Sequence, residues 1–142
     1  MTEIKLAVQD LCVEFRNAGK ISRAVRDVSF TLGREKLAIV GESGSGKSTV
    51  GRSLFRLHPP TARVTAKTLR FADIDLLAAS EKQIQAIRGA RMSMIMQDPK
   101  YSLNPVVRVG EQIAEAYLAH HKVPHREARE RALDMLAKVH IR

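Results

Sequence analysis

The sequence predicts an α/β fold: a β-rich N-terminal third, then a buried strand, a glycine-rich loop and several helices. Residues 4–15 and 21–32 are rich in Val, Ile, Leu and Phe, which is typical of strands. Residues 37–40 form a short, continuous apolar run, which predicts a strand buried on both faces. Toward the C-terminus, apolar residues recur at helical spacing. The 142 residues suffice for one domain of ordinary size.

The charge balance narrows the kind of partner that the chain would meet. A formal net charge of +9 suits a nucleotide, a nucleic acid or an anionic membrane surface, although a basic solvated face would give the same total. Aromatic residues make up only 4% of the chain, which argues against a binder built on stacked rings. The single cysteine, Cys12, excludes an internal disulfide, and no apolar run has the length of a membrane helix. We therefore expect a soluble protein that reaches a membrane only through a partner.

Turn residues and helix-capping residues predict further elements between residues 17 and 89. The turn residues at 17–20 join the first two segments into a predicted antiparallel pair, and residues 64–71 predict a further strand. Residues 47–57 predict a helix that ends before two prolines. Ser80 is a candidate cap for a short helix that would end at Gly89.

The C-terminal half adds a second predicted buried strand and two amphipathic helices. The strand is expected at residues 92–96, ahead of a proline-containing loop. Both helical stripes are predicted to face a core. Their members are Val109, Ile113, Ala116 and Tyr117 in the first helix, and Ala128, Ala132, Met135, Leu136 and Val139 in the second.

The stretch GESGSGKST, residues 41–49, carries the clearest chemistry. It satisfies G-x-x-x-x-G-K-[ST] directly after a predicted strand and before a predicted helix. Glycines let the backbone curl so that its N–H groups surround a polyphosphate, and the start of the helix favours negative charge. Lys47 can reach the β- and γ-phosphates, Ser48 can ligate Mg²⁺, and Thr49 can reach the α-phosphate region. The predicted nucleotide-binding residues are Gly41, Glu42, Ser43, Gly44, Ser45, Gly46, Lys47, Ser48 and Thr49.

This loop occurs in several classes of protein, so alternatives stay open on the motif alone. Small-molecule kinases, GTPases and recombinase-like ATPases all contain it. One alternative function is a small phosphate-loop kinase acting on a metabolite. Another is a basic module that binds nucleic acid, although the scarcity of aromatic residues counts against it.

Three stretches together resemble the ATPase subunits of ABC transporters. The loop has serines on both sides of Gly44, and the segment AVRDVSFTL before it looks like the β-subdomain of that family. The string QDPxxSLNP at 97–105 is similar to the ATPases of oligopeptide, dipeptide and nickel importers. The resemblance covers essentially the whole chain and implies an incomplete, RecA-like phosphate-loop core. It divides the chain into an antiparallel β-subdomain (1–36), the core up to the glutamine loop (37–105) and the start of an α-helical subdomain (106–142).

The resemblance also implies a function. The intact subunit would bind ATP and Mg²⁺ and couple ATP hydrolysis to the import of peptides or similar small solutes. Phe15 matches the position where the family places a ring against adenine, and Gln97 matches the glutamine that contacts Mg²⁺ and the attacking water. The implied partners are transmembrane permease subunits and a second ATPase subunit, identical or different, with no nucleic acid. The implied location is cytoplasmic and peripheral, at the inner face of the plasma membrane, without direct insertion.

Several features depart from the family pattern. The chain has Arg34-Glu35 where the family usually has Gly-Glu, with Gly33 shifted by one place. It contains no LSGGQ-like motif, and no apolar strand ends in Asp-Glu. We therefore expect no catalytic residue within this chain and a general base beyond Arg142. The chain looks like the N-terminal part of a longer subunit, and by itself it is expected to bind ATP without turning it over.

Overall fold

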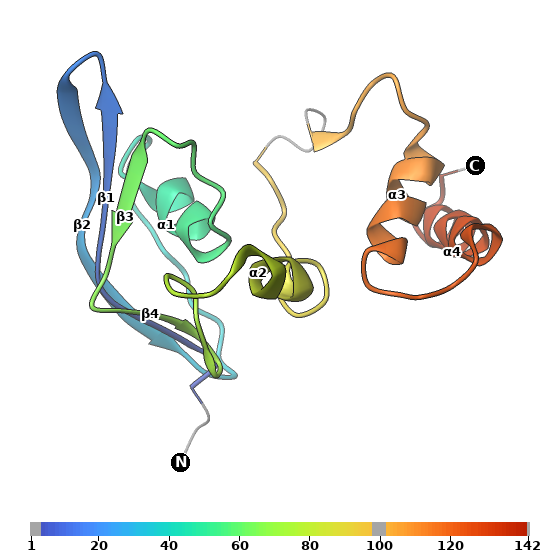
Figure 1. Cartoon of the computed structure of the whole chain (residues 1–142), viewed down its shortest axis with the longest axis horizontal. Helices are drawn as coiled ribbons and strands as arrows, with labels where there is room; N and C mark the ends of the chain where they lie inside the picture. The colour runs from blue at the N-terminus through green and yellow to red at the C-terminus, as the bar shows by residue number, and fades with distance from the viewer. Residues whose placement is uncertain (1–3, 98–101, 142) are drawn as a thin grey trace. The chain divides into compact units, whose positions relative to one another are not determined.

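The computed structural model describes residues 4–97 and 102–141, and the chain divides after Ile84 into two compact units (Figure 1). The strands are β1 (Leu6–Asn17), β2 (Lys20–Leu32), β3 (Ala62–Thr65), β4 (Thr68–Phe71) and β5 (Ile74–Asp75). The helices are α1 (Lys47–Leu54), α2 (Glu81–Ile87), α3 (Val109–Leu118) and α4 (His125–Lys138).

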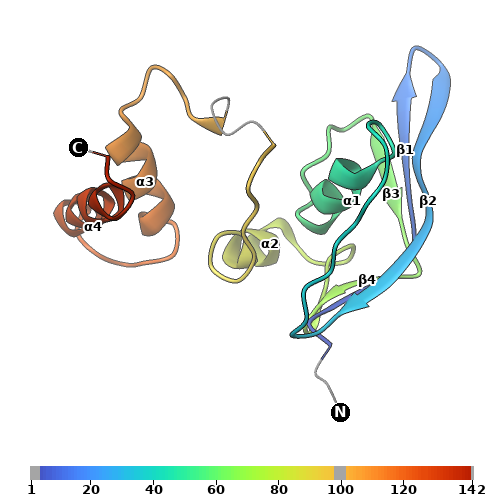
Figure 2. The same cartoon turned by 180° about the vertical axis from the view of Figure 1, so that it is seen from behind.

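The first unit is built on an antiparallel sheet. Its order is β2-β1-β4-β5, and β3 also pairs with β1. Figures 1 and 2 label β1 to β4 of this sheet. The turn between β1 and β2 has positive φ angles at Ala18 (45°) and Gly19 (78°), as a tight hairpin turn requires. The predicted antiparallel pair is therefore confirmed.

Bulges in the hairpin decide which side chains reach the core. The register shifts between Val8 and Leu11, where Asp10 has a φ of 53° and its N–H donates to Ser29 Oγ at 2.8 Å. An extra residue in a strand resets the alternation of its two faces. Consequently Val8 and Leu11, three positions apart, are both buried, and Val13 follows on the same face.

The same irregularity explains why the strand predicted at 64–71 appears as two. β3 pairs with residues 12–15 of β1 and β4 pairs with residues 6–9, so the break between them lies opposite the bulge. The core of this unit includes Leu69, Leu76 and Ile84. The helix predicted over 47–57 starts at Lys47 as expected but ends at Leu54, three residues early.

The short helix begins as predicted. Gln83 N–H donates to Ser80 Oγ at 3.3 Å, and Gln83 Oε1 accepts from Ser80 N–H at 2.9 Å. This reciprocal pair is a capping box, which satisfies two backbone donors at the start of α2. Gly89, which has a φ of 84°, follows the helix at its C-terminal end.

Two predicted strands are wrong. Residues 37–40 and 92–96 belong to no strand, and Arg88 and Met92 share an isolated bridge. Val40 is 88% exposed and Ile95 is 93% exposed. A strand buried on both faces needs ladder partners and cover on each face. Within the described residues, no strand pairs with either segment.

The second unit contains the helix pair α3 and α4, which pack against each other in both views (Figures 1 and 2). Its buried core consists of Ala114, Ala128 and Ala132, and part of the predicted stripes is therefore wrong. Val109, Ala116, Met135 and Val139 are exposed, whereas Ile113 and Tyr117 do pack against the core. The contact between the two helices is made by small alanine side chains, so the helices lie close together there. The exposed residues lie on other sides of α3 and α4. Across residues 4–97 and 102–141, the helices are too short or too polar to span a bilayer.

Candidate functional site

Lys47 is the first residue of α1, and its side chain reaches back to the glycine-rich loop. Its Nζ donates hydrogen bonds to Gly41 O at 2.8 Å, to Glu42 O at 2.6 Å and to Ser45 Oγ at 3.3 Å. All three acceptors are neutral, so no carboxylate neutralises the ammonium group in these contacts. The loop therefore holds a positive charge at its centre.

The loop is anchored against β2 at Gly46. This residue has a φ of 95°, and a Cβ placed there would lie 2.5 Å from Ala24 O. Ala24 is itself a bulge residue, because Val25 pairs with Val13 and the next partner pair is Arg23 and Glu14. Only glycine fits this close approach, which fixes the position of the loop on the sheet edge.

The start of α1 offers free backbone donors. Gly46 caps the helix without a side-chain hydrogen bond, so the first-turn N–H groups have no partner within the helix. The side chain of Ser48 is exposed at this end, and Thr49 is half-buried. Backbone N–H groups, a helix N-terminus and an ammonium group together make a cradle suited to an anion.

The cradle opens into a hollow of about 650 Å³, which we call the loop hollow. It is lined by residues 22–26 and Val28 of β2, by Ile39 and Val40, by Gly41 and residues 44–47 of the loop, and by Val50 of α1. Among the described residues, this lining contains three cationic side chains and no carboxylate. Sequence reasoning missed the contribution of β2, because nothing in the local pattern of a strand reveals which loop will lie against it.

Phe15, predicted to lie against a base, is not among these lining residues. Its ring meets the ring of His58 edge-on, with centroids 5.9 Å apart. His58 is held in place by Ser53, whose hydroxyl donates to Thr49 O at 2.9 Å and accepts from His58 Nε2–H at 2.9 Å. Burial and the nearby charge of Arg52 lower the pKa of His58 below its ordinary value, so the neutral ring is favoured.

Gln97 lies in the second unit, whereas the loop lies in the first. It is exposed, and its predicted role stays a prediction. Asp98 and Pro99 of the same motif lie outside the described residues. Further along, the side-chain amide of Gln112 donates to Asn104 O at 3.0 Å and accepts from Asn104 N–H at 2.8 Å, which ties the end of the motif to α3.

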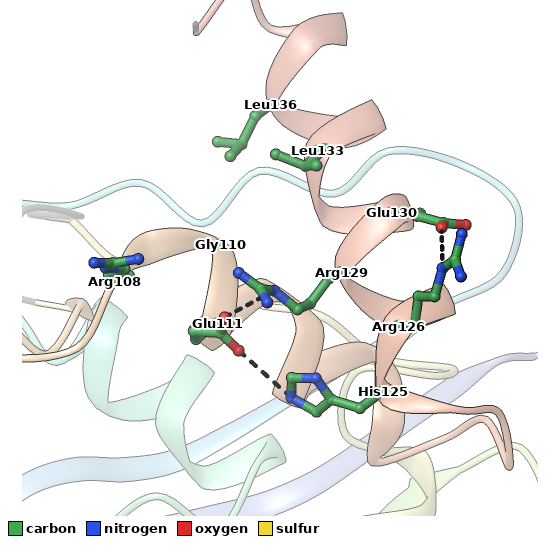
Figure 3. Close-up of a pocket in the computed structure, with 9 residues that line it drawn as sticks. All are labelled: Arg108, Gly110, Glu111, His125, Arg126, Arg129, Glu130, Leu133 and Leu136. Carbon is green, nitrogen blue, oxygen red and sulfur yellow. Dashed lines mark hydrogen bonds and ion pairs between the residues drawn. The ribbon is translucent and has the colours of Figure 1, made fainter.

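A second hollow of about 540 Å³, which we call the helix hollow, lies between α3 and α4 (Figure 3). Glu111 of α3 points toward α4, where its Oε1 lies 2.9 Å from Arg129 Nε and its Oε2 lies 3.4 Å from His125 Nε2. Arg126 pairs with Glu130 along α4 at 3.1 Å. None of the predicted site residues lines this hollow.

Comparison with known proteins agrees with the loop geometry. The ABC transporter family matches residues 25–142, which include the whole loop. A putative peptide import ATP-binding protein of Brucella melitensis is 44% identical over 137 residues, and the dipeptide transport ATP-binding protein of Bacillus subtilis is 47% identical over 138. The oligopeptide transport ATP-binding protein of Bacillus subtilis is 42% identical over 138 residues. In each case the match covers 96% of this chain.

The chain spans 41% of the length of the first two relatives and 38% of the third. The matched family is one of transporters, so the alternative of a metabolite kinase finds no support. The phosphate-loop motif, its anchoring on a β-rich sheet and the family match agree with one another. The chain therefore belongs to the ABC transporter family.

Proposed function

We propose that the glycine-rich loop binds the triphosphate of ATP. The observation that carries this proposal is the set of contacts of Lys47, whose ammonium group is held by neutral loop oxygens among the described residues. Phosphate oxygens carry negative charge, so they attract an ammonium group more strongly than neutral carbonyl and hydroxyl oxygens do. Lys47 would exchange loop oxygens for the β- and γ-phosphates, and the N–H groups of residues 41–49 would surround the same phosphates.

The same end of the helix suits Mg²⁺. The exposed Ser48 hydroxyl is a hard oxygen donor beside the cradle, and Mg²⁺ usually takes one or two protein ligands besides phosphate oxygens and water. When bound, Mg-ATP supplies the phosphoryl group for hydrolysis and the metal charge that offsets the phosphates. Gln97 is proposed as a second contact of the metal. None of the described residues that line the loop hollow is a carboxylate.

For the whole protein, we propose an ATP-binding subunit that hydrolyses ATP to drive the import of peptides or similar small solutes. The names of the relatives support this reading, since they are peptide, dipeptide and oligopeptide import or transport proteins. The proposed partners are transmembrane permease subunits and a second ATPase subunit. The proposed location is the cytoplasmic face of the membrane. The proposed domain is a nucleotide-binding one, divided at residues 36 and 105.

The test is titration of the 142-residue chain with Mg-ATP by isothermal calorimetry. Lys47→Ala is expected to weaken binding by about tenfold or more, because hydrogen bonds to charged groups contribute about 1.5–3 kcal/mol. Lys36→Ala is the matched control, since Lys36 is exposed and does not line the loop hollow. Equal affinity of the Lys47 variant and the unaltered chain would refute the proposal.

A further inference from the structure

We propose that His120 and Gln112 are positioning residues that fix both ends of the segment containing Gln97 to helix α3. This inference rests on the proposed function, because Gln97 is there proposed as a contact of Mg²⁺. Neither side chain belongs to the phosphate loop or to the string QDPxxSLNP. All of the contacts involved lie within the second unit.

The first attachment lies ahead of Gln97 in the sequence, at Gly89. This glycine has a φ of 84°, and a Cβ placed on it would lie 2.9 Å from His120 Nε2. The imidazole ring therefore occupies the space that a side chain at position 89 would need. Gly89 N–H donates to Met92 O at 2.7 Å, and Met92 N–H donates to Ile87 O at 3.0 Å, so the ring lies against a closed turn. The chain leaves this turn toward Gln97.

The end of α3 places the ring of His120. The backbone N–H of this residue donates to Tyr117 O at 3.1 Å, which continues the last turn of the helix. His120 is half-buried, whereas the neighbouring His121 is exposed and stacks its ring on that of Tyr117, with centroids 4.0 Å apart. The two histidines therefore have different partners, and His120 is the one that lies against Gly89.

The second attachment lies beyond Gln97 in the sequence, at Asn104. The side-chain amide of Gln112 bonds both backbone groups of Asn104, and its Nε2 also donates to Val107 O at 2.8 Å. Asn104 Oδ1 accepts from Val106 N–H at 3.1 Å, which closes a compact turn. Because Gln112 belongs to α3, these bonds hold the turn against that helix. Removing the one side chain would break three hydrogen bonds at once.

Both attachments are to the same helix, and Gln97 lies between them in the sequence. α3 is about 15 Å long at 1.5 Å per residue, whereas the chain between Gly89 and Asn104 could extend about 50 Å. A segment held at two nearby points has fewer conformations than one held at a single point. A group whose positions are already restricted loses less freedom when a ligand binds. The two side chains therefore favour the metal contact of Gln97 without touching the metal.

The experiment measures the ATP affinity of the 142-residue chain by calorimetry, once with Mg²⁺ and once with EDTA. We call the ratio of the two affinities the magnesium gain, since it separates the metal contacts from those of the loop. Gln97→Ala should lower this gain about two- to tenfold, which is the net contribution of one hydrogen bond. His120→Ala and Gln112→Ala should each lower the gain by about twofold or more, up to the value for Gln97→Ala, because they act through that residue. Their ATP affinity in EDTA should stay the same.

Two matched controls belong to the same helix end and the same helix. His121→Ala removes a ring contact beside His120 without reaching Gly89, so the magnesium gain should be unchanged. Glu115→Ala changes an exposed side chain of α3 and should also leave the gain unchanged.

A second set of measurements needs no nucleotide. Gly89→Ala places a methyl group against the ring of His120 and strains the backbone. It should lower the melting temperature less in the His120→Ala chain than in the unaltered chain, because the clash is gone and the strain alone remains. The NMR order parameter of the Gln97 backbone N–H should fall in His120→Ala and in Gln112→Ala, but not in His121→Ala.

Several results would overturn the inference. Additive effects of Gly89→Ala and His120→Ala would show that the ring does not lie against the glycine. Equal losses of ATP affinity with Mg²⁺ and with EDTA would make the two side chains merely structural. An unchanged order parameter of Gln97 in both variants would show that α3 does not restrain it. If Gln97→Ala left the magnesium gain unchanged, or if the unaltered chain bound no ATP, the proposed function would be wrong, and the order parameters would then decide whether α3 holds the segment.

Discussion

The loop hollow and the helix hollow both contain several basic side chains, but Lys47 in the first and Arg129 in the second have different kinds of partner. In the helix hollow, Glu111 pairs with Arg129 and contacts His125, and Glu130 pairs with Arg126. In the loop hollow, the contacts of Lys47 with the described part of the chain are to two carbonyl oxygens and one hydroxyl oxygen. The comparison teaches that a count of positive residues does not locate an anion site. The partners of each cation decide whether its charge is available to a ligand.

The two hollows also differ in the role of the glycine that each contains. Gly46 in the loop hollow has a positive φ and no room for a Cβ, whereas Gly110 in the helix hollow has nothing within 4 Å of a Cβ position. The first glycine serves a close approach of two chain segments. The second is an ordinary helical residue of α3.

The largest expected effect comes from exchanging these glycines for alanine. Gly46→Ala should lower the free energy of unfolding by about 1–3 kcal/mol, because it places a side chain in a strained conformation against Ala24 O. It should also weaken Mg-ATP binding by more than tenfold, as the loop shifts. Gly110→Ala should instead raise stability by up to about 1 kcal/mol, as in other helices. Thermal melting measures the stability of both variants, and calorimetry measures their binding of Mg-ATP. Stability changes of the same sign in the two variants would contradict the difference between the two glycines.

A smaller effect is expected at the ion pairs of the helix hollow. Glu111→Gln should lower the free energy of unfolding by about 0.5–1 kcal/mol, since it weakens two partly exposed contacts between α3 and α4. Glu130→Gln is the control: it affects a single pair within one helix and should cost about 0.3–0.5 kcal/mol. Chemical denaturation measures both values.

The Glu111→Gln variant also tests whether the carboxylate partner keeps the helix hollow from binding an anion. With Glu111 neutral, Arg129 and His125 lose their carboxylate partner, so added tripolyphosphate should perturb their NMR signals. In the unaltered chain these signals should stay in place, and only those of the loop should move. Strong perturbation of the helix hollow in the unaltered chain would contradict the distinction between the two sites.

The smallest expected effect is the pH dependence contributed by His58. Its pKa is lowered in the folded chain, so the unfolded chain binds more protons in the range just below about pH 7. The free energy of unfolding should therefore fall as the pH decreases through this range. His58→Asn should show a shallower fall, measured as melting temperature at a series of pH values. A slope identical in the two proteins would show that burial of His58 has no such consequence.

Local features were predictable because their causes lie within a few residues. The turn at 17–20 needs positive φ angles that Gly19 adopts readily, the start of α2 needs Ser80 with Gln83 three positions later, and α1 begins where the loop motif places it. Pro124, in an extended conformation, is the N-cap of α4, whose first residue is His125. In each case the sequence contains both the group and its partner.

By itself, then, the sequence determined the phosphate-loop motif, the hairpin and the helices, since these depend on neighbours along the chain. Only the tertiary structure decided that residues 37–40 are exposed, that Ala114 rather than Ala116 meets the second helix, and that Phe15 packs on His58. It also placed Arg23 in the loop hollow. A strand exists only where a distant segment completes its hydrogen bonds, and a side chain is buried only where another element covers it. Both conditions depend on residues far apart in sequence, and no local pattern encodes them.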